Sequence, residues 1–143
     1  MSETTDALKA VVTVEHAAVF TYGVITAFTN STRRTMVDEF TAAHRAARDT
    51  AAEAMRAAGS TPPDQEPGYV LPLTVSDPAS AAKAALAAET DCTVAYRSLL
   101  EKADTTAVRQ IGLDGLTASA NRAAQWRAAL KQSPFTVALP GSR

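Results

Sequence analysis

The amino-acid sequence predicts an all-α fold, and three observations lead to this expectation. Alanine, the strongest helix former, makes up roughly a fifth of the 143 residues. Aromatic residues are only 6% of the chain, and runs of β-branched residues are short. Apolar residues recur at helical spacing in four stretches, and turn-forming residues separate these stretches.

One domain, residues 1–143, is expected, because the length suits a single core. Thr4 and Thr5 supply N-cap chemistry for the first helix. Gly59 can end the second helix, and Asp77 followed by Pro78 can start the third. The expected elements are helices at about 4–30, 32–58, 78–103 and 105–131, a crossover at 59–77 and a tail at 132–143.

The crossover is rich in Pro, Gly, Asp and Gln, and it is long for a connection inside a compact domain. Helices of about 26 residues are roughly 40 Å long, and about 18 extended residues can return over that distance. One long crossover between the second and third helices is the connectivity of ferritin-like bundles. The sequence therefore predicts a ferritin-like four-helix bundle, two helical hairpins joined by a long crossover.

The charges nearly cancel, with 14 basic and 15 acidic side chains. This balance predicts neither a nucleic-acid partner nor an anionic membrane partner. Cys92 is the single cysteine, so no disulfide can form within the chain. The N-terminal region lacks a basic segment, and Lys9, Glu15 and His16 interrupt its apolar residues. We therefore expect neither a signal peptide nor a membrane span, and a cytoplasmic location.

Each predicted helix carries one ionisable residue within its apolar stripe: Glu15, His44, Glu89 and Arg122. Measured at about 1.5 Å per residue from the helix starts, all four fall near the middle of the bundle. Four such residues at one height predict a single buried polar cluster. His16 lies off the stripe and is expected at the surface.

A faint internal repeat adds residues to this cluster. Tyr22 follows Glu15 at the spacing at which Tyr96 follows Glu89, and the residues around His44 resemble those around Arg122. Arg48 lies one turn after His44, and either Asn121 or Arg122 faces the centre. The expected cluster is Glu15, Tyr22, His44, Arg48, Glu89, Tyr96, Asn121 and Arg122.

Four stretches resemble an actinobacterial ferritin-like domain family of unknown function, an alanine-rich group of conserved hypothetical proteins. They are residues 14–23 (Val-Glu-His-Ala-Ala-Val-Phe-Thr-Tyr-Gly), residues 43–49 (Ala-His-Arg-Ala-Ala-Arg-Asp), residues 69–72 (Tyr-Val-Leu-Pro) and residues 121–127 (Asn-Arg-Ala-Ala-Gln-Trp-Arg). The resemblance covers nearly the whole chain. It implies the bundle fold and no established activity.

A di-iron bundle places a Glu on each of two helices and Glu-x-x-His on the other two. Thr41 stands where the second helix needs a glutamate, and the fourth helix offers neither carboxylate nor imidazole. About three of the six ligands remain, namely Glu15, His44 and Glu89. These residues favour a metal-free network, and iron or manganese at the same three residues stays open as an alternative.

Three classes of function fit this pattern, and no catalytic residue is assigned. The favoured class is an interaction or structural module on a metal-free or metal-poor bundle. The alternatives are a metal-binding oxidoreductase or metal-storage protein with an incomplete di-metal site, and a small-ligand binder.

The first helix is apolar on the side opposite Glu15, where it carries Phe20, Val24 and Phe28. A helix that is apolar all round is covered on both sides. The cover is the crossover (Val70, Leu71, Leu73), the tail (Phe135) or a second subunit. We favour a homodimer through this helix.

Overall fold

The computed structural model describes residues 2–142; Met1 and Arg143, the ends of the expected domain and tail, lie outside the described residues. Four long helices dominate it: α1 (Glu3–Ile25), α2 (Arg34–Ala57), α3 (Pro78–Lys102) and α4 (Thr106–Ala129). Two short 3₁₀ helices, η1 (Thr26–Phe28) and η2 (Ser31–Arg33), connect α1 to α2. Residues 2–142 contain no β-strand.

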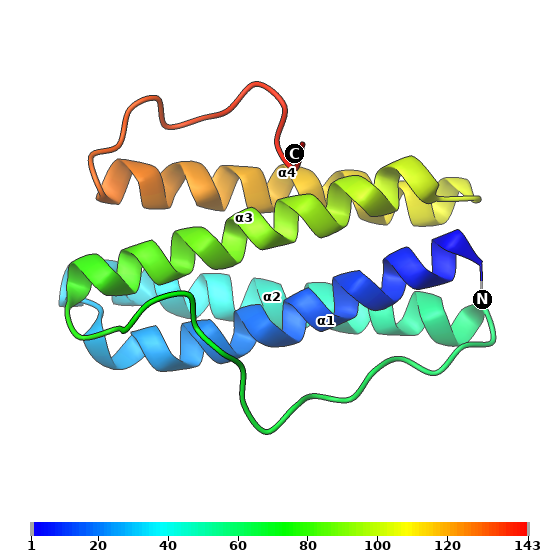
Figure 1. The fold of residues 1–143 in the computed structure, drawn as a ribbon, viewed down its shortest axis with the longest axis horizontal. Helices are drawn as coiled ribbons and strands as arrows, with labels where there is room; N and C mark the ends of the chain where they lie inside the picture. The colour runs from blue at the N-terminus through cyan, green and yellow to red at the C-terminus, as the bar shows by residue number, and fades with distance from the viewer. Residues whose placement is uncertain (1, 143) are drawn as a thin grey trace.

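The four helices lie alongside one another as two antiparallel hairpins, α1–α2 and α3–α4 (Figure 1). The crossover, residues 58–77, runs back along the bundle from the end of α2 to the start of α3. As a result α3 runs parallel to α2 and antiparallel to α1. The tail after α4 also turns back and passes over the second hairpin.

Local hydrogen bonds explain where the helices start. The side chain of Ser2, not that of Thr4 or Thr5, caps α1 by accepting from the Thr5 backbone. Asp77 and Ser80 form a reciprocal capping box at the start of α3, and Thr105 caps α4.

The first helix ends at Ile25, earlier than the expected 30, and threonine side chains bind carbonyl groups of its last turn. Thr26 donates to the Tyr22 carbonyl at 2.7 Å, and Thr29 donates to the Ile25 carbonyl at 2.8 Å. The chain then tightens into η1. At the end of α2, Gly59 adopts a φ of +81°, a conformation that glycine reaches without strain.

Small residues allow α3 and α4 to approach closely. A side chain at Gly112 would meet the Leu100 backbone, and a Cβ at Gly115 would lie 2.1 Å from the Tyr96 ring. The absence of a side chain at Gly115 therefore leaves room for the Tyr96 ring inside the bundle. The apolar core surrounds this ring and, nearer the other end, Trp126 and Ile25.

The crossover covers the outer face of α1. The Phe20 ring packs against Tyr69 with ring centroids 5.6 Å apart, and His16 Nε2 lies 3.2 Å from the Pro63 carbonyl oxygen. The expectation that His16 is a surface residue is therefore wrong: the crossover half-buries it. Val70 is exposed and Leu73 packs near the start of α3, so neither covers Phe20.

The segment Glu3–Phe28 is long and apolar enough to cross a membrane, by length and composition alone. In the structure its core face carries Glu15, whose side chain is buried in an ion pair. A core helix of a soluble bundle passes the same test. This feature is therefore weak support for a membrane span.

Candidate functional site

The centre of the bundle is an imidazole held between two carboxylates. His44 Nδ1 lies 2.7 Å from Glu15 Oε2, and His44 Nε2 lies 2.8 Å from Glu89 Oε2. The three side chains come from α2, α1 and α3 and are fully buried. Since both ring nitrogens face carboxylate oxygens, both carry protons and donate.

Glu89 is also bound by α1 and α4. The Tyr22 hydroxyl donates to Glu89 Oε2 at 2.5 Å, and Arg122 Nε donates to Glu89 Oε1 at 2.9 Å. Trp126 Nε1 in turn donates to the Tyr22 oxygen at 2.8 Å, and Arg122 also donates to Ser119 at 3.2 Å. These contacts fix the positions of both oxygens of the Glu89 carboxylate.

Glu15 is held in a corresponding way by α2 and by the second hairpin. Its Oε2 accepts from His44, and its Oε1 accepts from the Cys92 thiol at 3.7 Å. Glu15 also interacts electrostatically with Tyr96 and, after burial, contributes to the raised pKa of this tyrosine. Each tyrosine thus interacts with the glutamate of the other hairpin: Tyr22 with Glu89, and Tyr96 with Glu15. We call the whole set the central network: Glu15, Tyr22, His44, Glu89, Cys92, Tyr96, Ser119, Arg122 and Trp126.

The contacts within the central network determine its protonation. Burial alone would lower the pKa of His44, but hydrogen bonds to Glu15 and Glu89 outweigh it and raise this pKa to about 9. Burial would raise the pKa of Glu89, but His44 and Arg122 hold it below its usual value. At neutral pH His44 is therefore an imidazolium, and with the Arg122 guanidinium it pairs the carboxyl groups of Glu15 and Glu89.

Burial, together with nearby carboxylates, also keeps the weaker acids of the network protonated. The pKa values of Tyr22 and Cys92 are raised by burial and then by the negative charge of Glu89 and Glu15, respectively. Burial and Glu15 likewise raise the pKa of Tyr96. The Tyr22 hydroxyl and the Cys92 thiol therefore act as hydrogen-bond donors to the carboxylates.

Two residues of the expected cluster lie elsewhere. Arg48 does not reach the centre: its Nε donates to Asp49 at 3.0 Å near the surface, where its long side chain can stay hydrated. Asn121 is exposed, because one residue along a helix turns the side chain by about 100° away from Arg122. Arg122, only 8% exposed, is the α4 residue that faces the centre.

The apolar stripes of the predicted helices did not identify three members of the central network. In the sequence, Trp126 and Cys92 have the character of apolar core residues. Their N–H and S–H groups can be identified as hydrogen-bond donors only when the structure shows their acceptors. Ser119 lies three residues before Arg122, the spacing that places two side chains on one helix face. This three-residue spacing is the sequence feature from which Ser119 could have been predicted as a neighbour of Arg122.

The donor set does not fit a di-metal centre. Glu15, His44 and Cys92 each offer one ligand atom within 4.8 Å of the others. A metal ligand must be deprotonated, but the pKa of His44 is raised to about 9 and that of the buried Cys92 thiol is also raised. Arg122 adds a positive charge beside Glu89. The cationic side chains of His44 and Arg122 thus pair with the carboxylates, as metal ions do in a di-metal centre.

Comparison with solved structures defines the class of protein. Dps from Listeria monocytogenes superimposes with a TM-score of 0.82 at 12% identity, over 94% of this chain and 97% of that one. A dodecameric thioferritin, a bacterioferritin-related protein from Bacteroides fragilis, gives 0.77 at 17% identity, over 90% and 84%. The chain is therefore an all-α, ferritin-like four-helix protein, as the sequence predicted.

The family follows from a match over most of the chain. The chain belongs to a domain family of unknown function, DUF4439, which matches residues 7–143. A conserved hypothetical protein from Mycobacterium tuberculosis is 34% identical, with a TM-score of 0.87, over 90% of this chain and 97% of that one. A search of curated proteins gave no match.

We expect Arg122→Ala to destabilise the protein by about 3–5 kcal/mol, because it leaves the Glu89 carboxylate buried without its guanidinium. Arg48→Ala is the matched control: it removes an arginine near the surface and should cost less than about 1 kcal/mol. Urea unfolding of both variants measures the difference. Equal losses would contradict the assignment of Arg122 as the internal cation.

We expect the free energy of unfolding to fall as the pH rises from about 6.5 to about 9. His44 stays protonated in the folded state up to about pH 9, whereas the unfolded imidazole loses its proton near 6.5. This stabilisation is complete below pH 6.5 and is lost as the pH rises to about 9. The free energy of unfolding falls by roughly 3 kcal/mol over this range. Cys92 adds to the loss only at higher pH, since its ordinary pKa is 9.0.

Urea unfolding across this pH range, on the parent and on His44→Gln, isolates the contribution of the histidine. The variant has no titrating group at this position, so its stability should change less between pH 6.5 and 9. Parallel pH profiles for the two proteins would show that His44 is neutral in the folded state.

Proposed function

We propose that this ferritin-like protein is a metal-free bundle that serves as an interaction or structural module. One observation carries the proposal: all four carboxylate oxygens of Glu15 and Glu89 have donors from within the protein. Among residues 2–142 the sole buried side-chain nitrogen or oxygen without a partner is His16 Nδ1, outside the central network. A cation would have to displace protein donors in order to bind.

The balance of charge supports the same proposal. Two carboxylates face the cations of His44 and Arg122, so no uncompensated negative charge attracts a divalent ion. Removal of the imidazole proton would be needed first, and Arg122 would still repel a metal beside Glu89. A cytoplasmic location belongs to this proposal, as does the absence of a nucleic-acid or membrane partner.

The alternative class is a metal-binding oxidoreductase or metal-storage protein. A Bacillus anthracis protein described as a ferritin-like, diiron-carboxylate protein superimposes with a TM-score of 0.72, at 14% identity. At that identity the likeness concerns the fold alone. The present chain differs from the di-iron ligand pattern by Thr41 on α2 and by Ser119 and Arg122 on α4.

Self-association is the form of interaction that the comparisons favour, because the Bacteroides fragilis protein is a dodecamer. Our homodimer through α1 needs one revision: Tyr69 of the same chain already covers Phe20. Phe28 is 36% exposed, and Val24 lies one turn before it. We therefore centre the proposed contact on Val24 and Phe28.

We expect protein purified without chelator or nickel to contain less than one iron or manganese per chain, measured by elemental analysis. A triple variant, Thr41→Glu, Ser119→Glu and Arg122→His, restores Glu-x-x-His on α2 and α4 and serves as the gain-of-binding control. It should bind more iron(II) than the parent. Two metals per chain in the parent, with Glu15 and Glu89 as ligands, would contradict the metal-free proposal.

We expect Phe28→Glu to shift the protein from dimer to monomer, measured by sedimentation velocity, because it places a charge in an apolar contact. Leu113→Glu is the matched control, since Leu113 is an exposed apolar residue on α4. Its sedimentation should equal that of the parent. A parent that sediments as a monomer, or a Phe28→Glu variant that remains a dimer, would exclude this contact.

A further inference from the structure

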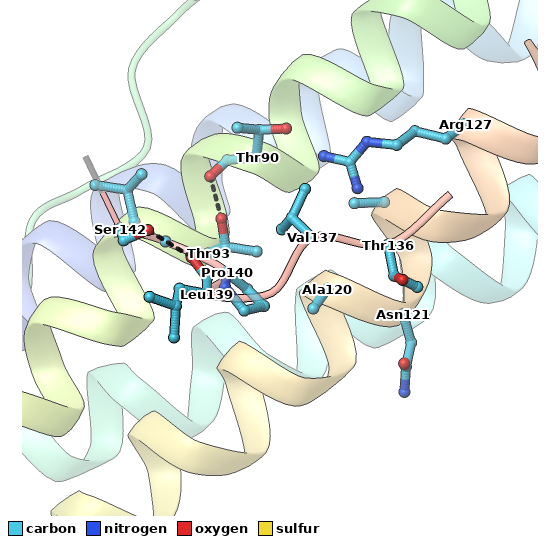
Figure 2. Close-up of a pocket in the computed structure, with 13 residues that line it drawn as sticks. Thr90, Thr93, Ala120, Asn121, Arg127, Thr136, Val137, Leu139, Pro140 and Ser142 are labelled. Atoms are coloured by element: carbon cyan, nitrogen blue, oxygen red, sulfur yellow. Dashed lines mark hydrogen bonds between the residues drawn. The ribbon is translucent and has the colours of Figure 1, made fainter. Parts of the chain in front are cut away.

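The C-terminal tail encloses a hollow that is separate from the central network. After α4 the tail turns back and crosses over α3 and α4, and a space of about 480 Å³ lies between them (Figure 2). Volumes of about 300–1,000 Å³ are usual for small-molecule sites. The helices contribute Thr93, Val94 and Ala120 to its wall, and the tail contributes Val137 and Leu139.

Contacts at two points anchor the tail above this hollow. Arg127 Nη1 donates to the Phe135 carbonyl at 3.2 Å, and Arg97 Nη1 donates to the Pro140 carbonyl at 3.3 Å. Gly141 lies directly on α3, where a Cβ would stand 2.2 Å from the Thr93 carbonyl oxygen. Its φ of +77° also favours glycine. The tail between these anchors arches over the helices, so the hollow is built into the fold.

Apolar side chains at the hollow lack a full cover. Val137 is 49% exposed and Leu139 is 62% exposed, although the tail passes directly over the two helices. Val94 and Ala120 on the opposite wall are half-buried. An apolar group in the hollow would remove these surfaces from water, which is favourable at about 25 cal/mol per Å².

The charge carried by the described residues that line the hollow is positive. Among residues 2–142, Arg127 is the only charged residue that lines the hollow, and no Asp or Glu of this part of the chain lines it. Figure 2 shows the Arg127 side chain reaching from α4 toward Val137. Within residues 2–142 its guanidinium has one hydrogen bond, to Phe135, and the fork carries five N–H donors. The remaining donors suit a carboxylate, the group that an arginine fork matches best.

We propose that this hollow binds a small organic anion with an apolar body, with its carboxylate on Arg127 and its hydrocarbon part against Val94, Val137 and Leu139. The site is independent of the metal-free proposal, because none of its residues belongs to the central network. Thr136 and Thr90 lie at its edge, where the carboxylate meets water.

The test is isothermal titration calorimetry of the full chain with octanoate. Two probes of equal chain length serve as comparisons: 1-octanol, which lacks the charge, and octylammonium, which reverses it. We expect saturable binding of octanoate, at least about tenfold tighter than that of either comparison, because a charge-assisted hydrogen bond contributes about this factor.

Variants connect the binding to the hollow. Arg127→Ala should weaken octanoate at least about tenfold, and Ala120→Trp should abolish binding by filling the space. Arg109→Ala is the matched control, since Arg109 also lies on α4 but bonds to the Ala103 carbonyl, outside the hollow. It should bind like the parent. Ala120→Trp leaves both tail anchors in place, so it decides the question if Arg127→Ala does not fold.

Three results would overturn the proposal: no saturable octanoate binding, equal affinity for octanoate and 1-octanol, or full affinity in Ala120→Trp. The last result would place the octanoate on another apolar surface.

Discussion

The imidazolium of His44, held between Glu15 and Glu89, is the interaction on which the arrangement of this bundle depends. A buried charge is costly unless it is paired and hydrogen-bonded, so each of these groups requires the other two at short distance. They come from α2, α1 and α3, and Arg122 adds α4 through its bond to Glu89. The rotation and height of all four helices must therefore satisfy the same few atoms.

The tyrosines interlock the two hairpins. Tyr22 of the first hairpin donates to Glu89 of the second, and Tyr96 of the second interacts electrostatically with Glu15 of the first. Alanine supplies eight of the 19 buried residues in the two apolar clusters around them, and such small, uniform side chains define the register between helices only weakly. We infer that the polar contacts select one register here, and that Gly115 is required so that the Tyr96 ring can reach its place.

Helical periodicity and capping residues predicted the four helices, because both depend on local chemistry, and the length of the crossover predicted how the two hairpins are connected. The same periodicity pointed to Glu15, His44, Glu89 and Arg122. It failed for Arg48, because a helical wheel gives the direction of Cβ but not the end point of a long side chain that can reach water. It also missed the donor of Trp126, because a residue in an apolar stripe shows its polar group only when a partner such as Tyr22 is in place.

The central network also restricts where a function can be located. Its donors and acceptors satisfy one another, and Glu15, His44 and Glu89 have no exposed surface through which a substrate could reach them. A neutral, mutually satisfied network of this kind stabilises and specifies a structure. Among residues 2–142, the exposed apolar side chains include Phe28 of η1 and, beside the hollow beneath the tail, Val137 and Leu139. We propose that recognition by this protein takes place at these two surfaces rather than at the buried carboxylates of the central network.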